Sequence, residues 1–251
     1  MSDDNLAEIR NEKAKKIQHP KGKLTAYERL NLLLDEGSFS EIDQHVTSEE
    51  NPEGEAVVTG TGTIHGRPVF VFSEDFSVMG GSLGEVVAKK ILKVMDHALD
   101  ARAPIIGIKD SGGARIQEGI SSLYGYAQIF KKNVEASGKI PQISVVVGPS
   151  AGGAVYSPAL TDFIFQVQDI GQLYVTGPAV VKTVTGEEVS YEELGGVEAH
   201  GTKSGVSNQI CESEEQSFEE IRYLMSFLPQ SSSQKPPAFI TEDESSRTIE
   251  S

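Results

Sequence analysis

The chain has 251 residues, 38% of them hydrophobic, which is enough for one large α/β domain with short appendages. Its net charge of −15 at pH 7 excludes nucleic acid as the main partner, because phosphate binding requires a basic surface that this composition lacks. The single cysteine, Cys211, excludes an intrachain disulfide and any multi-cysteine metal site within the chain.

The N-terminal region is charged and lacks the apolar stretch of a signal peptide, and no later run reaches membrane-spanning length. We therefore expect a cytoplasmic protein with no membrane partner. The mitochondrial matrix is the alternative if a transit peptide has been removed. The composition of residues 4–17 predicts a helix.

Two local patterns follow this helix. Thr25 and Glu28 have the spacing of a capping box, which predicts the start of a short helix whose apolar face includes Leu30, and Gly37 supplies its end. The valine- and threonine-rich segment 56–76 predicts a β-hairpin that turns at residues 65–68.

Strands and helices then alternate along the chain. A long helix is predicted to open with a second capping box, Ser82 to Glu85. It is followed by a strand at 105–109, a helix at 119–137, a strand at 142–147, a helix at 152–160, a strand at 162–166 and a last helix at 214–227. This alternation predicts parallel strands with right-handed crossovers. The polar residues 230–251 are expected to be a linker or a disordered tail after a domain of residues 1–229.

Three glycine-rich turns precede predicted helices: VMGGSLGE at 78–85, KDSGGARIQEG at 109–119 and VVGPSAGGAVYSPA at 146–159. If the strands at 105–109 and 142–147 are parallel neighbours, their loops emerge at the same sheet edge, where backbone N–H groups can converge on an anion. For any one turn alone, tight turning and close helix packing are the simpler explanation, but three such turns before helices favour a site.

Other candidates are weaker. Gly148-Pro149-Ser150-Ala151-Gly152 matches the nucleophile elbow of α/β-hydrolases, with His200 as the single histidine after Ser150. Arg115 either neutralises an anionic ligand or pairs with Asp110 or Glu118. Lys89 and Lys90 are expected to be solvated. The histidines show no metal-ligand spacing, so we predict no metal site.

Five segments, taken in order and spacing, resemble the carboxyltransferase β subunit of biotin-dependent acyl-CoA carboxylases, nearest the propionyl-CoA carboxylase type. They are KGKLTAYERLNLLLDEGSF, DFSVMGGSLGE, DSGGARIQEG, GPSAGGAVYSPALTDF and TGPAVVKTVTGEEVSYEELGG. The resemblance runs from about Gln18 to about Pro229 and covers only the N-terminal half of the usual subunit.

The resemblance implies a crotonase-like α/β fold, a spiral of ββα units with a parallel sheet. It implies that this half binds acyl-CoA while a C-terminal half or subunit receives carboxybiotin from a separate carrier protein. The carboxyl group would pass from biotin to the α-carbon of a short-chain acyl-CoA, with the biotin ureido group as the base. Implied partners are that second half, a biotin carboxyl carrier or biotin carboxylase subunit, and further copies in an oligomer.

The resemblance also assigns residues. The N–H groups of Gly113 and Ala114 would stabilise the enolate of the thioester, with Gly112 setting the turn. Arg115 would fix this loop rather than touch substrate. The remaining assignments shape the adjoining wall or the coenzyme A path: Gly152, Gly153, Ser77, Gly80 and Gly81.

Three alternatives stay open from the sequence. The same site can act in reverse, as a decarboxylase subunit for a carboxylated acyl-CoA. The chain can also be a catalytically silent half that binds coenzyme A esters or assembles with a carboxylase. The serine hydrolase reading of Ser150 is the third.

Overall fold

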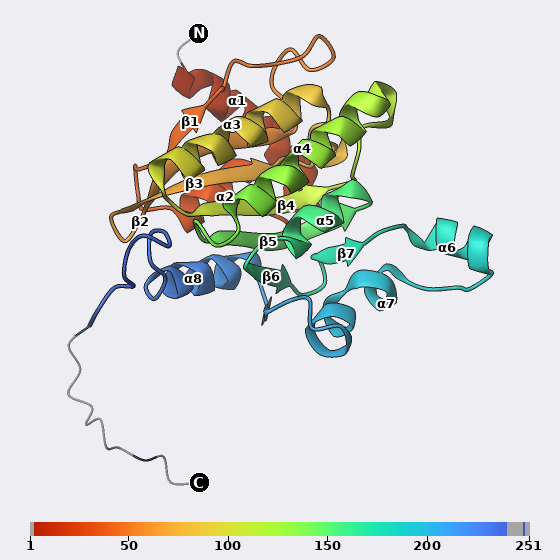
Figure 1. The fold of residues 1–251 in the computed structure, drawn as a ribbon. Coiled ribbons are helices and arrows are strands. Elements are labelled where there is room, and N and C mark those ends of the chain that lie inside the picture. The colour runs from red at the N-terminus through yellow and green to blue at the C-terminus, as the bar shows by residue number, and fades with distance from the viewer. Residues whose placement is uncertain (1–2, 240–247, 249–251) are drawn as a thin grey trace.

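The polypeptide folds around one mixed β-sheet, seen in a computed structural model that describes residues 3–239 and 248 (Figure 1). Across these residues the strand order is β1-β2-β3-β4-β5-β6-β8, and β7 pairs with β5. The β1–β2 and β2–β3 pairs are antiparallel, and the pairs from β3 onward are parallel. The strands are β1 (Ser40–Ile42), β2 (Val57–Ile64), β3 (Arg67–Glu74), β4 (Ile105–Ser111), β5 (Gln142–Ala151), β6 (Phe163–Val167), β7 (Gln172–Tyr174) and β8 (Gln209–Cys211).

Helices cover both faces of the sheet (Figure 1). Helices α2 and α8 pack on one face, and α3, α4 and α5 pack on the other. Alternate side chains of β4 point to opposite faces of the sheet. Ile106 and Ile108 pack in the core under α2 and α8, and Ile105 packs in the core under α3 and α4. The helices are α1 (Asp3–Gln18), α2 (Ala26–Leu33), α3 (Glu85–Ala101), α4 (Ile120–Ala136), α5 (Gly153–Ala159), α6 (Pro178–Thr185), α7 (Tyr191–Gly195) and α8 (Glu214–Met225).

Most predicted elements are confirmed with shifted ends. Thr25 and Glu28 form the predicted capping box at the start of α2. The hairpin is β2 and β3, turning at His65 and Gly66, whose φ angles of 53° and 72° suit a tight two-residue turn. Strands β4 and β5 are parallel neighbours, as expected.

The predicted capping box at Ser82 is wrong. Helix α3 begins at Glu85, and Gly84 precedes it without any side-chain cap. Leu83 instead forms a parallel bridge with Ala114, so the chain is still extended at this point. The Glu85 N–H donates instead to the carboxylate of Glu118 at 2.5 Å. The acceptor at the start of α3 therefore comes from a distant part of the chain and not from Ser82.

The strand predicted to end at residue 147 continues to Ala151. Pro149, Ser150 and Ala151 pair with β7, so this part of the glycine-rich segment is strand rather than turn. The chain turns at Gly152, where φ is 55°.

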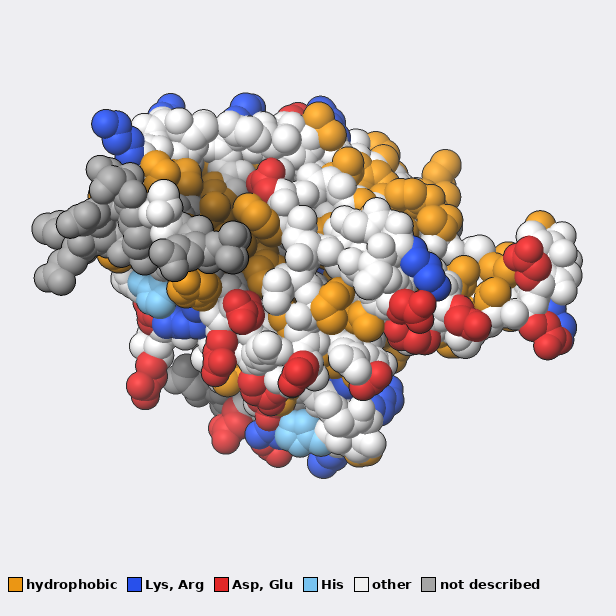
Figure 2. Space-filling model, turned by 90° about the horizontal axis from the view of Figure 1, so that it is seen from below, with side chains coloured by type: hydrophobic (Ala, Val, Ile, Leu, Met, Phe, Trp, Pro, Cys, Tyr) orange, Lys and Arg blue, Asp and Glu red, His pale blue; other side chains and the backbone are white. Residues whose placement is uncertain are grey.

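Residues 175–205 form an arm that carries α6 away from the sheet, and Figure 2, viewed from below, shows this projection; α7 returns to the sheet, where Gln166 donates to the Gly195 carbonyl at 3.1 Å. No residue of α6 is buried. Exposed hydrophobic side chains along the arm are Val175, Val180, Val184 and Tyr191.

The domain boundary at residue 229 stays a prediction. Beyond it, the N–H of Ser232 donates to the carbonyl oxygen of Lys139 at 2.9 Å, and Gln230 hydrogen-bonds Pro68. Residues 240–247 and 249–251 of the predicted tail lie outside the described residues. Across the described chain, no helix has the length and apolar character needed to cross a membrane.

Candidate functional site

The three glycine-rich segments meet at the carboxyl edge of β3, β4 and β5. A Cβ atom added at Gly113 would lie 2.7 Å from the carbonyl oxygen of Ala151, and one at Gly81 would lie 2.1 Å from that of Asp110. Both positions also have positive φ, 104° and 68°. Glycine is required at both positions, because any side chain would collide with a neighbouring backbone.

In the loop that follows β4 (the first loop, residues 111–115), the N–H groups differ in whether they already have a hydrogen-bond partner. The N–H of Gly112 donates to the carbonyl of Gly80 at 2.9 Å, and that of Gly113 donates to the Ser111 hydroxyl at 3.1 Å. Among the described residues, the N–H of half-buried Ala114 donates no hydrogen bond. Of the two donors assigned by resemblance, Ala114 is therefore the open one, while Gly113 has a partner.

The loop that follows β5 (the second loop, at Gly152 and Gly153) supplies the adjoining wall. The N–H of Gly152 donates to Tyr174 at 3.1 Å, whereas Gly153 is the first residue of α5 and has no carbonyl of its own helix to donate to. A Cβ at Gly153 would come within 2.6 Å of the Tyr126 ring, so Tyr126 supports this wall from below.

Arg115 fixes the first loop by ion pairs, one of the two roles predicted for it. Its side chain is 2% exposed and binds Glu55 at 3.0 Å and Glu118 at 2.8 Å. Burial works to raise the pKa of Glu55, but hydrogen bonds from Ser48 and Arg115 outweigh it, so the pKa is lowered. The predicted alternative partner, Asp110, pairs elsewhere.

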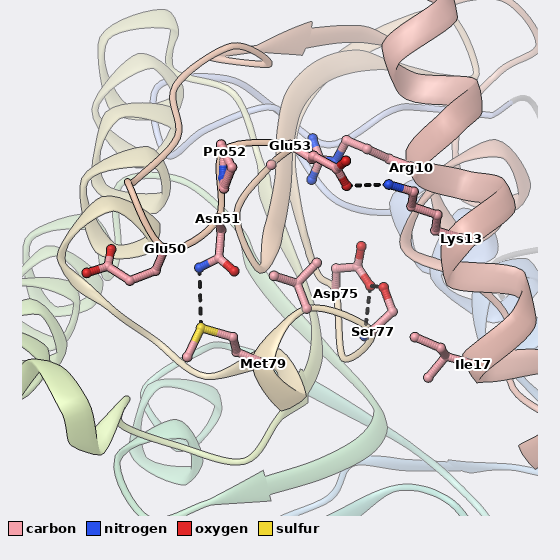
Figure 3. Close-up of a pocket in the computed structure, with 12 residues that line it drawn as sticks. Arg10, Lys13, Ile17, Glu50, Asn51, Pro52, Glu53, Asp75, Ser77 and Met79 are labelled. Carbon is pink, nitrogen blue, oxygen red and sulfur yellow. Dashed lines mark hydrogen bonds and ion pairs between the residues drawn. The ribbon is translucent and has the colours of Figure 1, made fainter.

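A pocket of about 400 Å³ lies beside these loops (Figure 3). Helix α1 supplies Arg10, Lys13 and Ile17, the loop at 50–54 forms the opposite side, and Ser77 and its neighbours close the base. Within the pocket Lys13 pairs with Glu53, and the Asp75 carboxylate accepts the Ser77 hydroxyl at 2.5 Å. The pocket brings together Ser77, which was predicted, and α1 side chains, which were not.

A network of buried charges lies below the first loop. The Asp110 carboxylate accepts from Lys23 at 2.7 Å, Arg29 at 3.0 Å and Gln18 at 3.1 Å. Arg29 also donates to Glu214 at 2.6 Å. Burial lowers the pKa of Lys23 and raises that of Glu214, and in each case the opposite charge of the partner works against the shift.

The structure decides against one alternative and against one expectation. The Ser150 hydroxyl is buried without a partner, while His200 bonds the carbonyl of Leu173 and the hydroxyl of Ser204, so no Ser–His couple forms. Lys90 is 1% exposed rather than solvated, because its position on α3 faces the sheet. Within the described residues, no cluster of three or more His, Cys, Asp or Glu could hold a metal ion.

The sequence interpretation missed Ser111. Its hydroxyl accepts the Gly113 N–H and donates to the Gly81 carbonyl at 2.6 Å, so it joins two of the three glycine-rich segments. A serine placed two residues before a glycine is a known side-chain-to-backbone turn pattern, and that signal was available.

Glycine-rich loops at the carboxyl edge of a mostly parallel sheet define an α/β protein with a candidate site lined by backbone N–H groups. The model of the carboxyl transferase domain family matches residues 17–251, and the chain belongs to this family. Its sequence is 56% identical to the propionyl-CoA carboxylase beta chain of Roseobacter denitrificans, over 88% of this chain and 45% of that protein. It is 53% identical to the methylmalonyl-CoA decarboxylase subunit alpha of Veillonella parvula, over 96% of this chain and 49% of that protein.

Among solved structures, transcarboxylase 12S matches with a TM-score of 0.87 and 44% identity, over 96% of this chain and 50% of that one. It is described as a hexamer assembly with methylmalonyl-coenzyme A and methylmalonic acid bound. The crotonase-like fold expected from the sequence is thereby confirmed. The chain spans about half the length of the curated relatives it matches.

Proposed function

We propose that this chain is the acyl-CoA-binding half of a biotin-dependent carboxyltransferase acting on propionyl-CoA or a similar short-chain acyl-CoA. The observation that carries the proposal is the uncommitted N–H of Ala114, held among three glycine-rich segments beside a pocket. Family membership and the acyl-CoA ester bound in transcarboxylase 12S support the same assignment.

The proposed chemistry of this chain is positioning and charge stabilisation. Loss of an α-proton from a thioester places negative charge on the carbonyl oxygen, and a fixed N–H donor stabilises that charge where it develops. Ala114 would donate to this oxygen, and Gly113 would join it if its N–H is shared with Ser111. Gly112 would set the turn, and Gly152 and Gly153 would form the wall.

The pocket is the proposed path for coenzyme A. Ser77 contributes a hydroxyl, and exposed Lys13 would contact a phosphate group in exchange for its partner Glu53. Arg10 is nearly buried and already bonds Glu41 and the Glu55 carbonyl, so its part is to shape the wall. Gly80 and Gly81 do not line the pocket, so their proposed place is between the pocket and the first loop.

Biotin carried on another protein would supply the carboxyl group. Gly112 is exposed and Ala114 half-buried, so the loop can be reached from outside this chain, as such a delivery requires. Exposed hydrophobic side chains on and before α4, Ile116, Ile120, Leu123 and Tyr124, support docking of the second carboxyltransferase half nearby. Assembly with a biotin carrier or biotin carboxylase subunit, oligomerisation, and a cytoplasmic or mitochondrial location stay predictions.

Decarboxylation of a carboxylated acyl-CoA is the second candidate, favoured by the 53% identity to the Veillonella subunit. It uses the same enolate site in the opposite direction. Product analysis separates the two: incubation with methylmalonyl-CoA alone releases carbon dioxide in a decarboxylase complex, whereas a carboxylase complex forms methylmalonyl-CoA from propionyl-CoA, bicarbonate and ATP.

Calorimetric titration of the chain with propionyl-CoA and with coenzyme A tests the proposed site. We expect both to bind, and an Ala114→Pro variant, which lacks the N–H, to lose the extra affinity of the ester while it still binds coenzyme A. In the assembled enzyme the same variant is expected to lose about 10²- to 10³-fold in kcat. Equal binding of the ester by both proteins would contradict the role of Ala114, and no binding by the unchanged protein would contradict the acyl-CoA assignment.

A further inference from the structure

The segment between β3 and α3 contains a run of left-handed residues. Met79, Gly80 and Gly81 have φ angles of 47°, 65° and 68°. Gly80 and Gly81 adopt this conformation at no steric cost, but Met79 does not, since its side chain disfavours positive φ. Such strain persists only where the surrounding contacts require it.

This turn directs successive backbone groups toward the first glycine loop. The carbonyl of Gly80 accepts the Gly112 N–H at 2.9 Å, and the carbonyl of Gly81 accepts the Ser111 hydroxyl at 2.6 Å. Leu83 continues the contact, with its N–H donating to Gly113 and its carbonyl accepting from Arg115, both at 2.9 Å. The backbone on both sides of Ala114 is therefore held by one segment.

The other side of the same segment faces the pocket. Ser77, Val78 and Met79 line it, and the Met79 sulfur accepts a hydrogen bond from the Asn51 side chain at 3.3 Å (Figure 3). Met79 is 41% exposed, so a ligand in the pocket can reach it. The next two residues, Gly80 and Gly81, contact the loop that carries Ala114.

We propose that Met79–Leu83 is a positioning element that holds the Gly113–Ala114 loop. A ligand bound in the pocket contacts Met79 and thereby stabilises this loop. This deepens the proposed function and rests on it where the ligand is concerned. Gly80 and Gly81 then act through the loop rather than by touching coenzyme A, and Met79 is the ligand-facing end of the element.

Gly80→Ala in the full chain tests the positioning role. An alanine here meets nothing nearer than the Phe76 ring at 3.9 Å, so it adds left-handed strain without a collision. Gly138→Ala is the matched control, because Gly138 has φ of 71°, equally open surroundings and a place at the far end of α4. Residue-resolved hydrogen exchange of the free protein is the measurement.

We expect Gly80→Ala to speed exchange of the Leu83, Gly112 and Arg115 amides roughly 5- to 30-fold, the factor that a strain of about 1–2 kcal/mol converts to. The control should leave these amides unchanged and affect only residues near 138. Unchanged exchange in Gly80→Ala, or the same acceleration in both variants, would overturn the positioning role.

Met79→Ala tests the ligand-facing end. Propionyl-CoA should slow exchange of the Gly112 and Arg115 amides in the unchanged protein by at least about 5-fold, and clearly less in Met79→Ala, whose free protein keeps the same backbone contacts. Equal protection in both would overturn the part assigned to Met79. Failure of the unchanged protein to bind propionyl-CoA would overturn the proposed function and this coupling, while exchange in the free protein still decides whether the segment holds the loop.

Discussion

The carboxylate of Asp110 and the guanidinium of Arg29 lie 3.0 Å apart, and both side chains are fully buried. Asp110 is the penultimate residue of β4, directly before Ser111 and the loop that carries Ala114, and Arg29 belongs to α2. Lys23 and Glu214 complete a cluster with two positive and two negative charges. Helices α2 and α8, far apart in the sequence, are thus tied to the strand that precedes the proposed site.

Replacing Asp110 by asparagine should destabilise the protein by about 3–5 kcal/mol, because it leaves buried Arg29 and Lys23 with one carboxylate between them. Urea unfolding followed by circular dichroism measures the loss. Glu85→Gln, which removes one partner of the exposed Lys89–Glu85 pair, is the control and should cost less than about 1 kcal/mol. Equal effects of the two substitutions would contradict the role of the buried network.

Partners close in sequence were predictable and distant ones were not. The spacing of Thr25 and Glu28, three residues apart, predicts their capping box. Glu118, also three residues from Arg115, was predicted as its partner. Glu55, the other partner of Arg115, lies 60 residues away, and Arg29 lies 81 residues from Asp110. The sequence around these residues does not predict the Arg115–Glu55 or the Arg29–Asp110 pair, because only the tertiary fold brings such distant segments together.

The same distinction explains the site. The glycine spacing predicted three turns, and the alternation of strands and helices placed two of them at one edge. Which N–H group stays open depends on tertiary contacts, since Gly80 takes the N–H of Gly112 and Ser111 takes that of Gly113. Lys90 was misjudged for a related reason, because the face of α3 on which it lies is defined by packing against the sheet.

Lys90 makes the stability depend on pH. Burial, with a further contribution from the charge of Arg10, lowers the pKa of Lys90 to about 8, against 10.5 ordinarily. Its Nζ has a single hydrogen bond among the described residues, to Val57 at 3.3 Å. Between about pH 8 and 10 the folded protein therefore binds fewer protons than the unfolded chain, and the cost of burying the ammonium disappears as the pH rises.

We expect Lys90→Met to raise the free energy of unfolding by about 1–3 kcal/mol at pH 7, and this advantage to shrink toward pH 10. Denaturant unfolding at several pH values checks both parts. Lys89→Met, on the exposed side of the same helix, should change little at any pH. A gain that does not vary with pH would show that packing rather than charge is responsible.

Arg115→Lys should destabilise the protein by about 1–3 kcal/mol, although the charge is kept. One ammonium cannot reproduce the two separate ion pairs and the bond to the Ser82 carbonyl at 3.2 Å, so the buried Glu55 carboxylate loses its partner. For a chain of this length we expect a fall in Tm of roughly 2–4 °C per kcal/mol, measured by calorimetry. Arg102→Lys at an exposed position is the control, and an equal small shift in both would contradict the role of Arg115.

Ser150→Ala separates a structural serine from a nucleophile. The Ser150 hydroxyl is fully buried and lacks a hydrogen-bond partner among the described residues, so its removal should leave stability unchanged or raise it by up to about 1 kcal/mol. Ser111→Ala, which deletes a buried hydroxyl with two hydrogen bonds, should instead cost about 1–3 kcal/mol.

A fluorophosphonate should label neither the unchanged protein nor Ser150→Ala. Labelling of the unchanged protein that disappears in Ser150→Ala would revive the hydrolase interpretation and overturn the structural role given to Ser150.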